Sequence, residues 1–260
     1  MEANPDASGL LGGRHAEGRD DGVVRAYLRD HPDLCLAEPK ETHFFDTEKY
    51  FTGGPVNYRT LHAHFRPSPG QLLGEATPIT MYWADAPRRV WEYNPHMKLI
   101  CILRNPIDRA YSHWNMERER GTDDLPFLDA IRQETERCRA ALPLQHRIYS
   151  YIDRGFYSEQ IRRLWRFFPP AQTLFLRTES LRDHPQATLD RVFDFLGVSR
   201  QPVRPQLVHA RPYPAPLSGL AREFLRVRYE WEIREVGRLL DWDCLGWLQP
   251  SQTVETAPPS

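Results

Sequence analysis

Apolar positions along the chain follow two patterns, which are short continuous runs and longer stretches with an apolar residue every three or four positions. The continuous runs at residues 99–103 and 173–179 predict strands that are buried on both faces of a parallel sheet. The spaced pattern at residues 161–168, 189–196 and 220–240 predicts helices that pack on that sheet. Strands and helices that alternate in this way predict an α/β fold with right-handed crossovers.

The segment 98–121, KLICILRNPIDRAYSHWNMERERG, joins a predicted strand to a predicted helix. The strand ends at Arg104, Asn105 can cap a helix, and Pro106 suits its first position, so the helix is expected to run to about residue 120. In open α/β sheets, ligands bind beyond the carboxyl ends of the strands. The Arg104 guanidinium suits a phosphate there, and Ser112 adds a hydroxyl. The turn predicts an anion site, although an ordinary strand and helix with a solvated arginine fits the same pattern.

The same segment has the form K-L-I-x-x-L-R-[DN]-P-x-x-R-A-Y-S-x almost without gaps. It resembles the 3'-phosphate-binding segment of sulfotransferases that use 3'-phosphoadenosine 5'-phosphosulfate (PAPS), in particular the heparan sulfate sulfotransferase-like branch and its bacterial relatives. The resemblance implies that Arg104 and Ser112 bind the 3'-phosphate. It also implies the fold of that family, a P-loop-containing nucleotide hydrolase-like parallel sheet flanked by helices.

A second motif, KETHFFD at residues 40–46, places two acids, a histidine and a lysine around two phenylalanines. Alone, it fits an ordinary loop whose aromatic residues fill the core. It resembles the K-E-x-H-F-F-D motif of the same sulfotransferases, which implies Glu41 as the catalytic base, with His43 and Asp46 supporting it. A carboxylate within hydrogen-bond reach can take the proton of an acceptor hydroxyl as the hydroxyl attacks sulfur. Lys40 is expected to stabilise the charge that develops on the bridging oxygen.

Three weaker matches extend the resemblance. The R-G-x-Y-x-x-Q pattern at residues 154–160 places Tyr157 beside the predicted cleft. The segment 208–214 looks like the mobile loop that closes over PAPS in relatives, in which Arg211 adds a phosphate contact. The segment 72–78 resembles G-E-K-S-P-x-Y, but Ala76 replaces a lysine that meets the substrate in many heparan-type enzymes. That replacement argues against an anionic polysaccharide as acceptor.

The beginning of the chain departs from the family pattern. Relatives have a first strand, a phosphate loop of the form G-T-Q-K-G-G-T-T and a helix that leads to H-P-D-L. The H-P-D-L is present at residues 31–34, but the loop position holds GGRHAEGRDDG, which has no lysine. Glycines let backbone N–H groups approach a phosphosulfate, and a helix N-terminus favours the anion. Asp20 and Asp21 would repel it.

A shift of reading frame offers an explanation. Read one nucleotide out of frame, with GCA for Ala16 and GAA for Glu17 among the codons, the region permits Gly-Thr-Gln-Lys-Gly-Gly-Thr-Thr in register with H-P-D-L. Upstream, residues 9–13 can become Asp-Phe-Leu-Val-Ala, which suits a first strand. Our hypothesis is that two compensating frame errors, near Gly9 and near Val24, disguise a normal loop. A different codon for Ala16 or Glu17 contradicts it, and the alternative is a divergent loop in a weakened or non-catalytic protein.

Length and composition favour one globular domain over residues 1–250, with residues 1–24 anomalous and residues 251–260 a disordered tail. The formal net charge of −1 argues against a nucleic-acid partner. No run of about 18 apolar residues is present to span a bilayer, and no secretory signal is visible, so we expect no membrane partner. The oligomeric state stays open.

Cysteine and lysine usage suggest where the protein works. The four cysteines are far apart and form no C-x-x-C pair, so we expect neither zinc nor disulfides, no metal cofactor and a cytoplasmic location. Of the 34 basic residues, 31 are arginine, since lysine occurs only at Lys40, Lys49 and Lys98. Together with 23 prolines, this suggests a GC-rich bacterial gene.

The motifs together predict an enzyme that transfers the sulfuryl group of PAPS to a hydroxyl, or less readily an amine, of a carbohydrate or small metabolite. A nucleotide kinase shares the fold class, but it would show G-K-[ST] and a magnesium-binding acid. The alternative is a non-catalytic protein that binds adenosine 3',5'-bisphosphate (PAP) or PAPS with a degenerate 5'-phosphosulfate loop. That alternative predicts binding without turnover.

Overall fold

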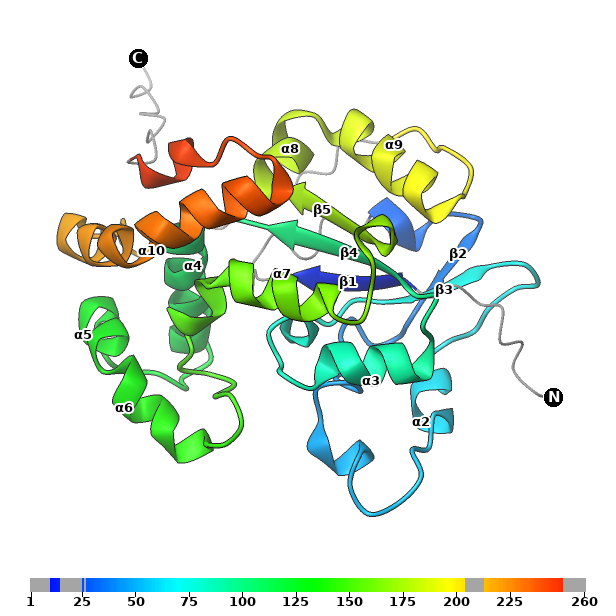
Figure 1. The fold of residues 1–260 in the computed structure, drawn as a ribbon, viewed down its shortest axis with the longest axis horizontal. Coiled ribbons are helices and arrows are strands. Elements are labelled where there is room, and N and C mark those ends of the chain that lie inside the picture. The colour runs from blue at the N-terminus through cyan, green and yellow to red at the C-terminus, as the bar shows by residue number, and fades with distance from the viewer. Residues whose placement is uncertain (1–9, 15–24, 26, 204–212, 250–260) are drawn as a thin grey trace.

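The computed structural model describes residues 10–14, 25, 27–203 and 213–249, which are built around one five-stranded sheet (Figure 1). Every strand pairing is parallel, and the strand order is β2-β3-β1-β4-β5. The strands are β1 (Leu10–Arg14), β2 (Leu34–Leu36), β3 (Leu72–Glu75), β4 (Lys98–Leu103) and β5 (Thr173–Arg177). The predicted α/β class, a parallel sheet flanked by helices, is confirmed.

The chain path places a switch of direction at β1. From β1 the chain goes to the edge strand β2, returns through β3 to the side of β1, and then crosses to β4 and β5 on the other side. In sheets of this type, ligands bind at the carboxyl edge beside such a point. The turn after β4 and the segment after β2 both start at this edge. Residues 15–24, which contain most of the candidate phosphate loop and follow β1, lie outside the described residues.

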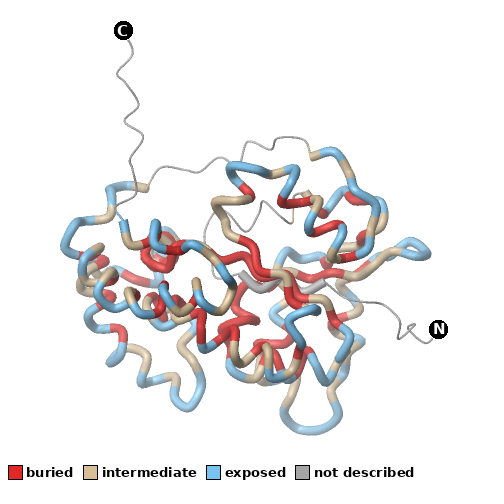
Figure 2. The backbone as a smooth tube through the Cα atoms, turned by 45° about the horizontal axis from the view of Figure 1, so that its top comes forward, coloured by how far each residue is buried: buried red, intermediate tan, exposed pale blue. Residues whose placement is uncertain are grey.

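Strand β4 is buried on both faces, as its continuous apolar run predicts. Leu99, Cys101 and Leu103 belong to one hydrophobic cluster, which also takes apolar residues from helices, among them four of eight residues or more. Ile100 and Ile102 belong to a second cluster, on which a fifth helix packs. The four helices are α3 (Ala86–Tyr93), α4 (Pro106–Glu119), α7 (Tyr157–Trp165) and α10 (Gly219–Leu240), and the fifth is α9 (Pro185–Leu196). Figure 2 shows the buried backbone concentrated along this central strand region.

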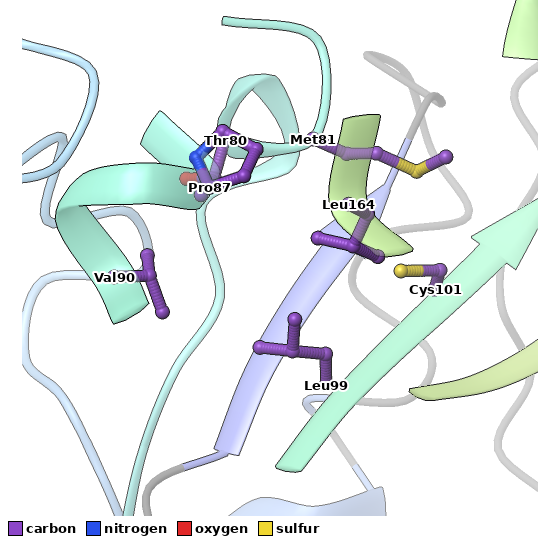
Figure 3. A pocket seen from close by; sticks show the side chains of 7 residues that line it. All are labelled: Thr80, Met81, Pro87, Val90, Leu99, Cys101 and Leu164. Carbon is purple, nitrogen blue, oxygen red and sulfur yellow. The ribbon is translucent and has the colours of Figure 1, made fainter. Parts of the chain in front are cut away.

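Between β4, α3 and α7 the first cluster leaves a small cavity of about 20 Å³. Figure 3 shows Leu99, Cys101 and Leu164 on one side of it and Val90 on the other. A space of this size with an apolar lining has too few polar partners to hold an ordered water molecule. It is a packing defect of the core.

Helix α4 begins and ends where the sequence predicts. The Asn105 side chain accepts a hydrogen bond from the backbone N–H of Ile107 at 3.0 Å, and Pro106 occupies the first helical position. Gly121, which follows the C-cap residue Arg120, has a φ of 72°, a left-handed conformation that glycine adopts without steric cost. The cap therefore fixes the direction in which the chain leaves β4 past Arg104.

The apolar stripes predicted for three other helices face the core. Fully or almost fully buried members of these stripes are Ile161, Leu164, Leu189, Val192, Phe193, Leu196, Ile233 and Val236. Phe168, three residues after the end of α7, is also completely buried. The interpretation of the α7 stripe as core is thus confirmed.

The segment 125–142 is highly charged, which by itself predicts one solvated outer helix, but the structure divides this segment. The chain makes α5 (Phe127–Arg132), α6 (Glu134–Cys138) and a 3-10 turn (Arg139–Ala141). The break falls at Gln133, whose ψ of 0° leaves the helical range. Glu134 is buried and accepts the backbone N–H groups of Ile152 at 2.6 Å and Asp153 at 2.8 Å. The prediction is wrong because this carboxylate satisfies backbone donors that a solvated helix would not reach.

Two further α-helices in the described part of the chain are short, α2 (Arg59–His62) and α8 (Thr178–Asp183). All four cysteines are free thiols. In the part of the chain that the structure describes, no cluster of His, Cys, Asp and Glu is placed to hold a metal ion. The described helices also include none with the length and apolar character needed to cross a membrane.

Candidate active site

The loop that carries the KETHFFD motif follows β2 at the carboxyl edge of the sheet. Its two phenylalanines anchor it: Phe44 and Phe45 are each 1% exposed, and the ring of Phe44 stacks on that of Tyr50 with centroids 4.9 Å apart. The side chains of Glu41 and His43 stay 27% and 46% exposed. Burial of the aromatic residues thus fixes the loop and leaves the polar residues accessible to a ligand.

Four residues of this loop that the sequence singles out make direct contacts with one another. Nδ1 of His43 lies 3.0 Å from Oδ2 of Asp46, and Nε2 of the same ring lies 3.3 Å from Oε2 of Glu41. The ammonium group of Lys40 lies 3.7 Å from the other oxygen of Glu41. One imidazole ring therefore bridges two carboxylates, and Glu41 is held between two basic side chains.

The charges in this cluster favour a protonated histidine. The hydrogen bond to Asp46 and then that to Glu41 raise the pKa of His43 to about 10, against the opposing effect of burial. Burial alone would raise the pKa of Asp46, but hydrogen bonds from His43 and Arg147 outweigh it and lower that pKa. At neutral pH both ring N–H groups of His43 donate, one to each carboxylate.

Residues at the end of β3 and just after it support the backbone of the loop. His43 has a φ of 49°, which is uncommon outside glycine. The Thr77 hydroxyl oxygen accepts the backbone N–H groups of Thr42 at 3.1 Å and His43 at 3.3 Å. The hydroxyl groups of Thr77 and Thr42 both donate to Oε2 of Glu75, at 2.6 Å and 3.1 Å. This carboxylate at the end of β3 supports the strained turn, a role that sequence reasoning missed.

Glu75 should make the stability of the protein depend on pH. It is buried, and burial raises its pKa to about 7 from 4.5, although the hydrogen bonds from Thr77 and Thr42 oppose the rise. Between about pH 4.5 and 7 the folded chain holds this proton more tightly than the unfolded chain does. The contribution of Glu75 to the free energy of unfolding should therefore fall as the pH rises through this range, by up to about 3 kcal/mol, and stay constant above it.

In Glu75→Gln this contribution should disappear. Urea unfolding at pH 5, 6, 7 and 8 measures it, as a shallower dependence of the unfolding free energy on pH in the variant. Glu92→Gln, a change in an exposed ion pair with Arg88, is the matched control and should keep the wild-type dependence. Equal slopes for wild type and Glu75→Gln would contradict the assignment.

Arg147 approaches the cluster from the segment between α6 and α7. Its Nη1 group donates to Oδ2 of Asp46 at 2.6 Å, and its Nη2 group donates to the backbone carbonyl of Asp46. The guanidinium group lies over the ring of Trp83 at 4.4 Å, and the Trp83 indole N–H donates to Glu48 at 2.8 Å. No motif marks Arg147, which is 101 positions from Asp46 in the chain.

The second half of the site is the turn after β4. The hydroxyl group of Tyr157 donates to the carbonyl oxygen of Arg104 at 3.0 Å, and Tyr157 is completely buried. Tyr157 thus supports the turn from within the protein, and its direct contact with the co-substrate stays a prediction. This bond uses only the backbone of Arg104.

Ser112, in the second turn of α4, is 2% exposed. Its hydroxyl oxygen has no hydrogen-bond partner among the described residues. Because leaving a buried hydroxyl unpaired costs about 1–3 kcal/mol, the position suits a hydroxyl that bonds to a ligand. Arg211, the third predicted phosphate contact, lies outside the described residues.

A family model described as "Sulfotransferase domain" matches residues 80–211, just over half of the chain. The chain belongs to the sulfotransferase family. The match includes the Arg104 turn, Ser112 and Arg147, and it begins after the KETHFFD loop and β3.

Sulfotransferases that act on heparan sulfate, by their names, are among its relatives. Human heparan sulfate glucosamine 3-O-sulfotransferase 6 is 34% identical over 174 residues, which cover 67% of this chain and 48% of that protein. Human bifunctional heparan sulfate N-deacetylase/N-sulfotransferase 2 is 27% identical over 189 residues, which cover 68% of this chain and 20% of that protein. The chain spans about half the length of the curated 3-O-sulfotransferases that it matches.

Solved sulfotransferase structures share the fold. A sulfotransferase from Alicyclobacillus acidocaldarius superposes with a TM-score of 0.80 at 23% identity, covering 95% of this chain and all of that one. A mouse sulfotransferase complexed with PAP superposes with a TM-score of 0.57 at 13% identity, covering 93% and 89%. The sulfotransferase fold implied by the sequence motifs is thereby confirmed.

Proposed function

We propose that this protein transfers the sulfuryl group of PAPS to a hydroxyl group of an acceptor. The observation that carries the proposal is the Glu41 carboxylate, which is partly exposed at the carboxyl edge of the sheet and held by His43 and Lys40. Membership of the sulfotransferase family supports it. The resemblance of residues 40–46 and 98–121 to the motifs of that family also supports it.

The residues present fit the 3'-phosphate of the co-substrate. Arg104, which follows β4, and the N-terminal end of α4 offer positive charge at the carboxyl edge of the sheet, and the Ser112 hydroxyl, unpaired among the described residues, offers a neutral donor. We expect Arg211 to add a second guanidinium group. Bound PAPS would supply an activated sulfuryl group.

The chain's own part in the chemistry is to take a proton and to neutralise charge. As the acceptor oxygen bonds to sulfur, its proton passes to a carboxylate oxygen of Glu41, and the bond from sulfur to the bridging phosphate oxygen breaks. PAP leaves with the electron pair of that bond. The ammonium group of Lys40 is expected to stabilise the bridging oxygen. His43, fixed by Asp46, keeps Glu41 in position.

We propose a carbohydrate as the acceptor, with a small metabolite as the other class. The names of the relatives support a carbohydrate. Ala76 in place of a lysine and the net charge of −1 favour an acceptor with little negative charge of its own. We also propose a cytoplasmic bacterial setting, supported by the four free thiols and the arginine-rich, proline-rich composition.

A second candidate function is PAP or PAPS binding without transfer. It is favoured by Asp20 and Asp21, which stand where the family has a glycine-lysine loop. In that case Arg104 and Ser112 would still bind the 3'-phosphate. The 5'-phosphosulfate would then lack the positive charge that the lysine of the family's loop supplies for its activation.

The test separates the two functions. The protein is incubated with ³⁵S-labelled PAPS and a panel of neutral oligosaccharides, desulfated heparan and simple alcohols and amines, and PAP binding is measured by calorimetry. We expect PAP to bind and the ³⁵S label to be transferred to the hydroxyl group of an acceptor. Binding with no transfer to any acceptor would support the second candidate, and the absence of both would contradict the proposed function.

A further inference from the structure

Asp46 binds two cationic side chains through one oxygen. Nδ1 of His43 and Nη1 of Arg147 lie 3.0 Å and 2.6 Å from Oδ2, whereas Oδ1 is buried without a partner among the described residues. Asp46 itself is completely buried. The two cations therefore share the charge of one carboxylate oxygen, and the strength of one contact limits the strength of the other.

Arg147 is fixed on three sides. Its second guanidinium nitrogen donates to the Asp46 carbonyl, its planar group lies over the Trp83 ring at 4.4 Å, and its own backbone carbonyl accepts a hydrogen bond from Arg154. This planar fork makes two parallel contacts with a single residue, a geometry that lysine cannot reproduce. The arrangement is built to hold Asp46, although the Arg147 side chain is 41% exposed.

We propose that Arg147 is a positioning residue of the transferase site. It fixes Asp46 and weakens the attraction between Asp46 and Nδ1 of His43, so that Nε2 of His43 stays bound to Glu41. Its meaning for catalysis rests on the proposed function. The contact itself exists with or without turnover. Arg147 acts through Asp46 and His43 and takes no part in the chemical step.

The charged groups around His43 decide the sign of the expected effect. Glu41 and Asp46 contact its ring. Glu75 lies beneath the loop, and the charge of His43 lowers the pKa of its carboxyl group. Lys40 contacts Glu41 and reaches His43 only through it. Arg147 is the cation that contacts the same carboxylate from another element. Removal of this positive charge should strengthen the His43–Asp46 bond and make His43 lose its proton at higher pH.

Ring-¹⁵N NMR of His43 in the free protein, from pH 7 to 11.5, measures this, with the signal assigned by its loss in His43→Gln. In Arg147→Met, which keeps an apolar stem over Trp83, the titration midpoint should rise by about half a pH unit or more. Arg147→Gln, a second neutral variant, should shift it in the same direction. An unchanged midpoint in either folded variant overturns the proposal.

Arg137→Met is the matched control. Arg137 also pairs with one aspartate, Asp123 at 2.8 Å, and lies over an aromatic ring, Tyr149 at 3.5 Å, but it makes no contact with Asp46. Its loss should leave the His43 midpoint unchanged. An equal shift in Arg137→Met would show that loss of any nearby arginine has this effect, and it would overturn the proposal.

Kinetics supply the second readout. Arg147→Met should lower kcat about tenfold and leave the KM for PAPS and the affinity for PAP unchanged, because the 3'-phosphate residues are not touched. An unchanged kcat in a variant whose midpoint moves would overturn the positioning role. If the wild-type protein shows no transfer at all, the proposed function fails, and the NMR titration still decides whether Arg147 controls His43.

Discussion

Glu41→Gln is expected to lower kcat by about 10²- to 10⁴-fold, the range that a well-placed general base contributes. The amide of glutamine keeps the size of the side chain and one acceptor oxygen, but it cannot take the proton of an acceptor hydroxyl. Glu41 is 27% exposed, and the loop is anchored by Phe44 and Phe45, so the fold should persist. Initial rates with labelled PAPS give the loss, and calorimetry with PAP should give an affinity within about twofold of wild type.

The neighbouring Glu38→Gln is the control for that variant. Glu38 is an exposed carboxylate three positions away, and it should be replaceable with no change in kcat. Near-normal turnover in Glu41→Gln would make the base assignment wrong. His43 would then be the next candidate, although its role as a proton acceptor would require it to lose a proton that two carboxylates hold.

Arg104→Ala is expected to weaken PAP binding by about 2–3 kcal/mol, roughly 30- to 150-fold. A guanidinium group at the end of β4 should make charge-assisted hydrogen bonds to the 3'-phosphate. The contact between Tyr157 and this turn uses the carbonyl of residue 104, which alanine retains. The variant should therefore keep this backbone contact while it removes the guanidinium group, and calorimetry at fixed salt measures the change.

Two further variants serve as comparisons for Arg104→Ala, one with a smaller expected effect and one with none. Ser112→Ala should weaken PAP binding by only about 1 kcal/mol, because it removes a neutral donor. Arg200→Ala removes an exposed arginine, 61% accessible and paired with Asp194, beyond the end of α9 and away from the Arg104 turn. It should not change the affinity. If Arg104→Ala bound PAP as tightly as Arg200→Ala, the predicted phosphate site would be wrong.

The sequence determined the parts of this protein that depend on local order. The apolar run of β4, the Asn105-Pro106 start of α4 and the glycine after it are short-range signals, and the structure has each of them where the pattern predicts. The residues Glu41, His43 and Asp46 lie within six positions on one loop, so their meeting needed only the turn between them. Cap and strand patterns of this kind depend only on a few neighbouring residues, so they can be recognised without knowledge of the tertiary structure.

Only the tertiary structure decided which distant groups support that loop. Arg147 meets Asp46 across 101 positions, and Glu75 at the end of β3 bonds to Thr42 across 33. The break at Gln133 turns Glu134 inward to backbone donors near residue 152, against the expectation from its charged neighbours. These contacts arise because buried donors and acceptors must be paired wherever the packed chain brings them, and the identity of the partner is set by packing and not by any local pattern.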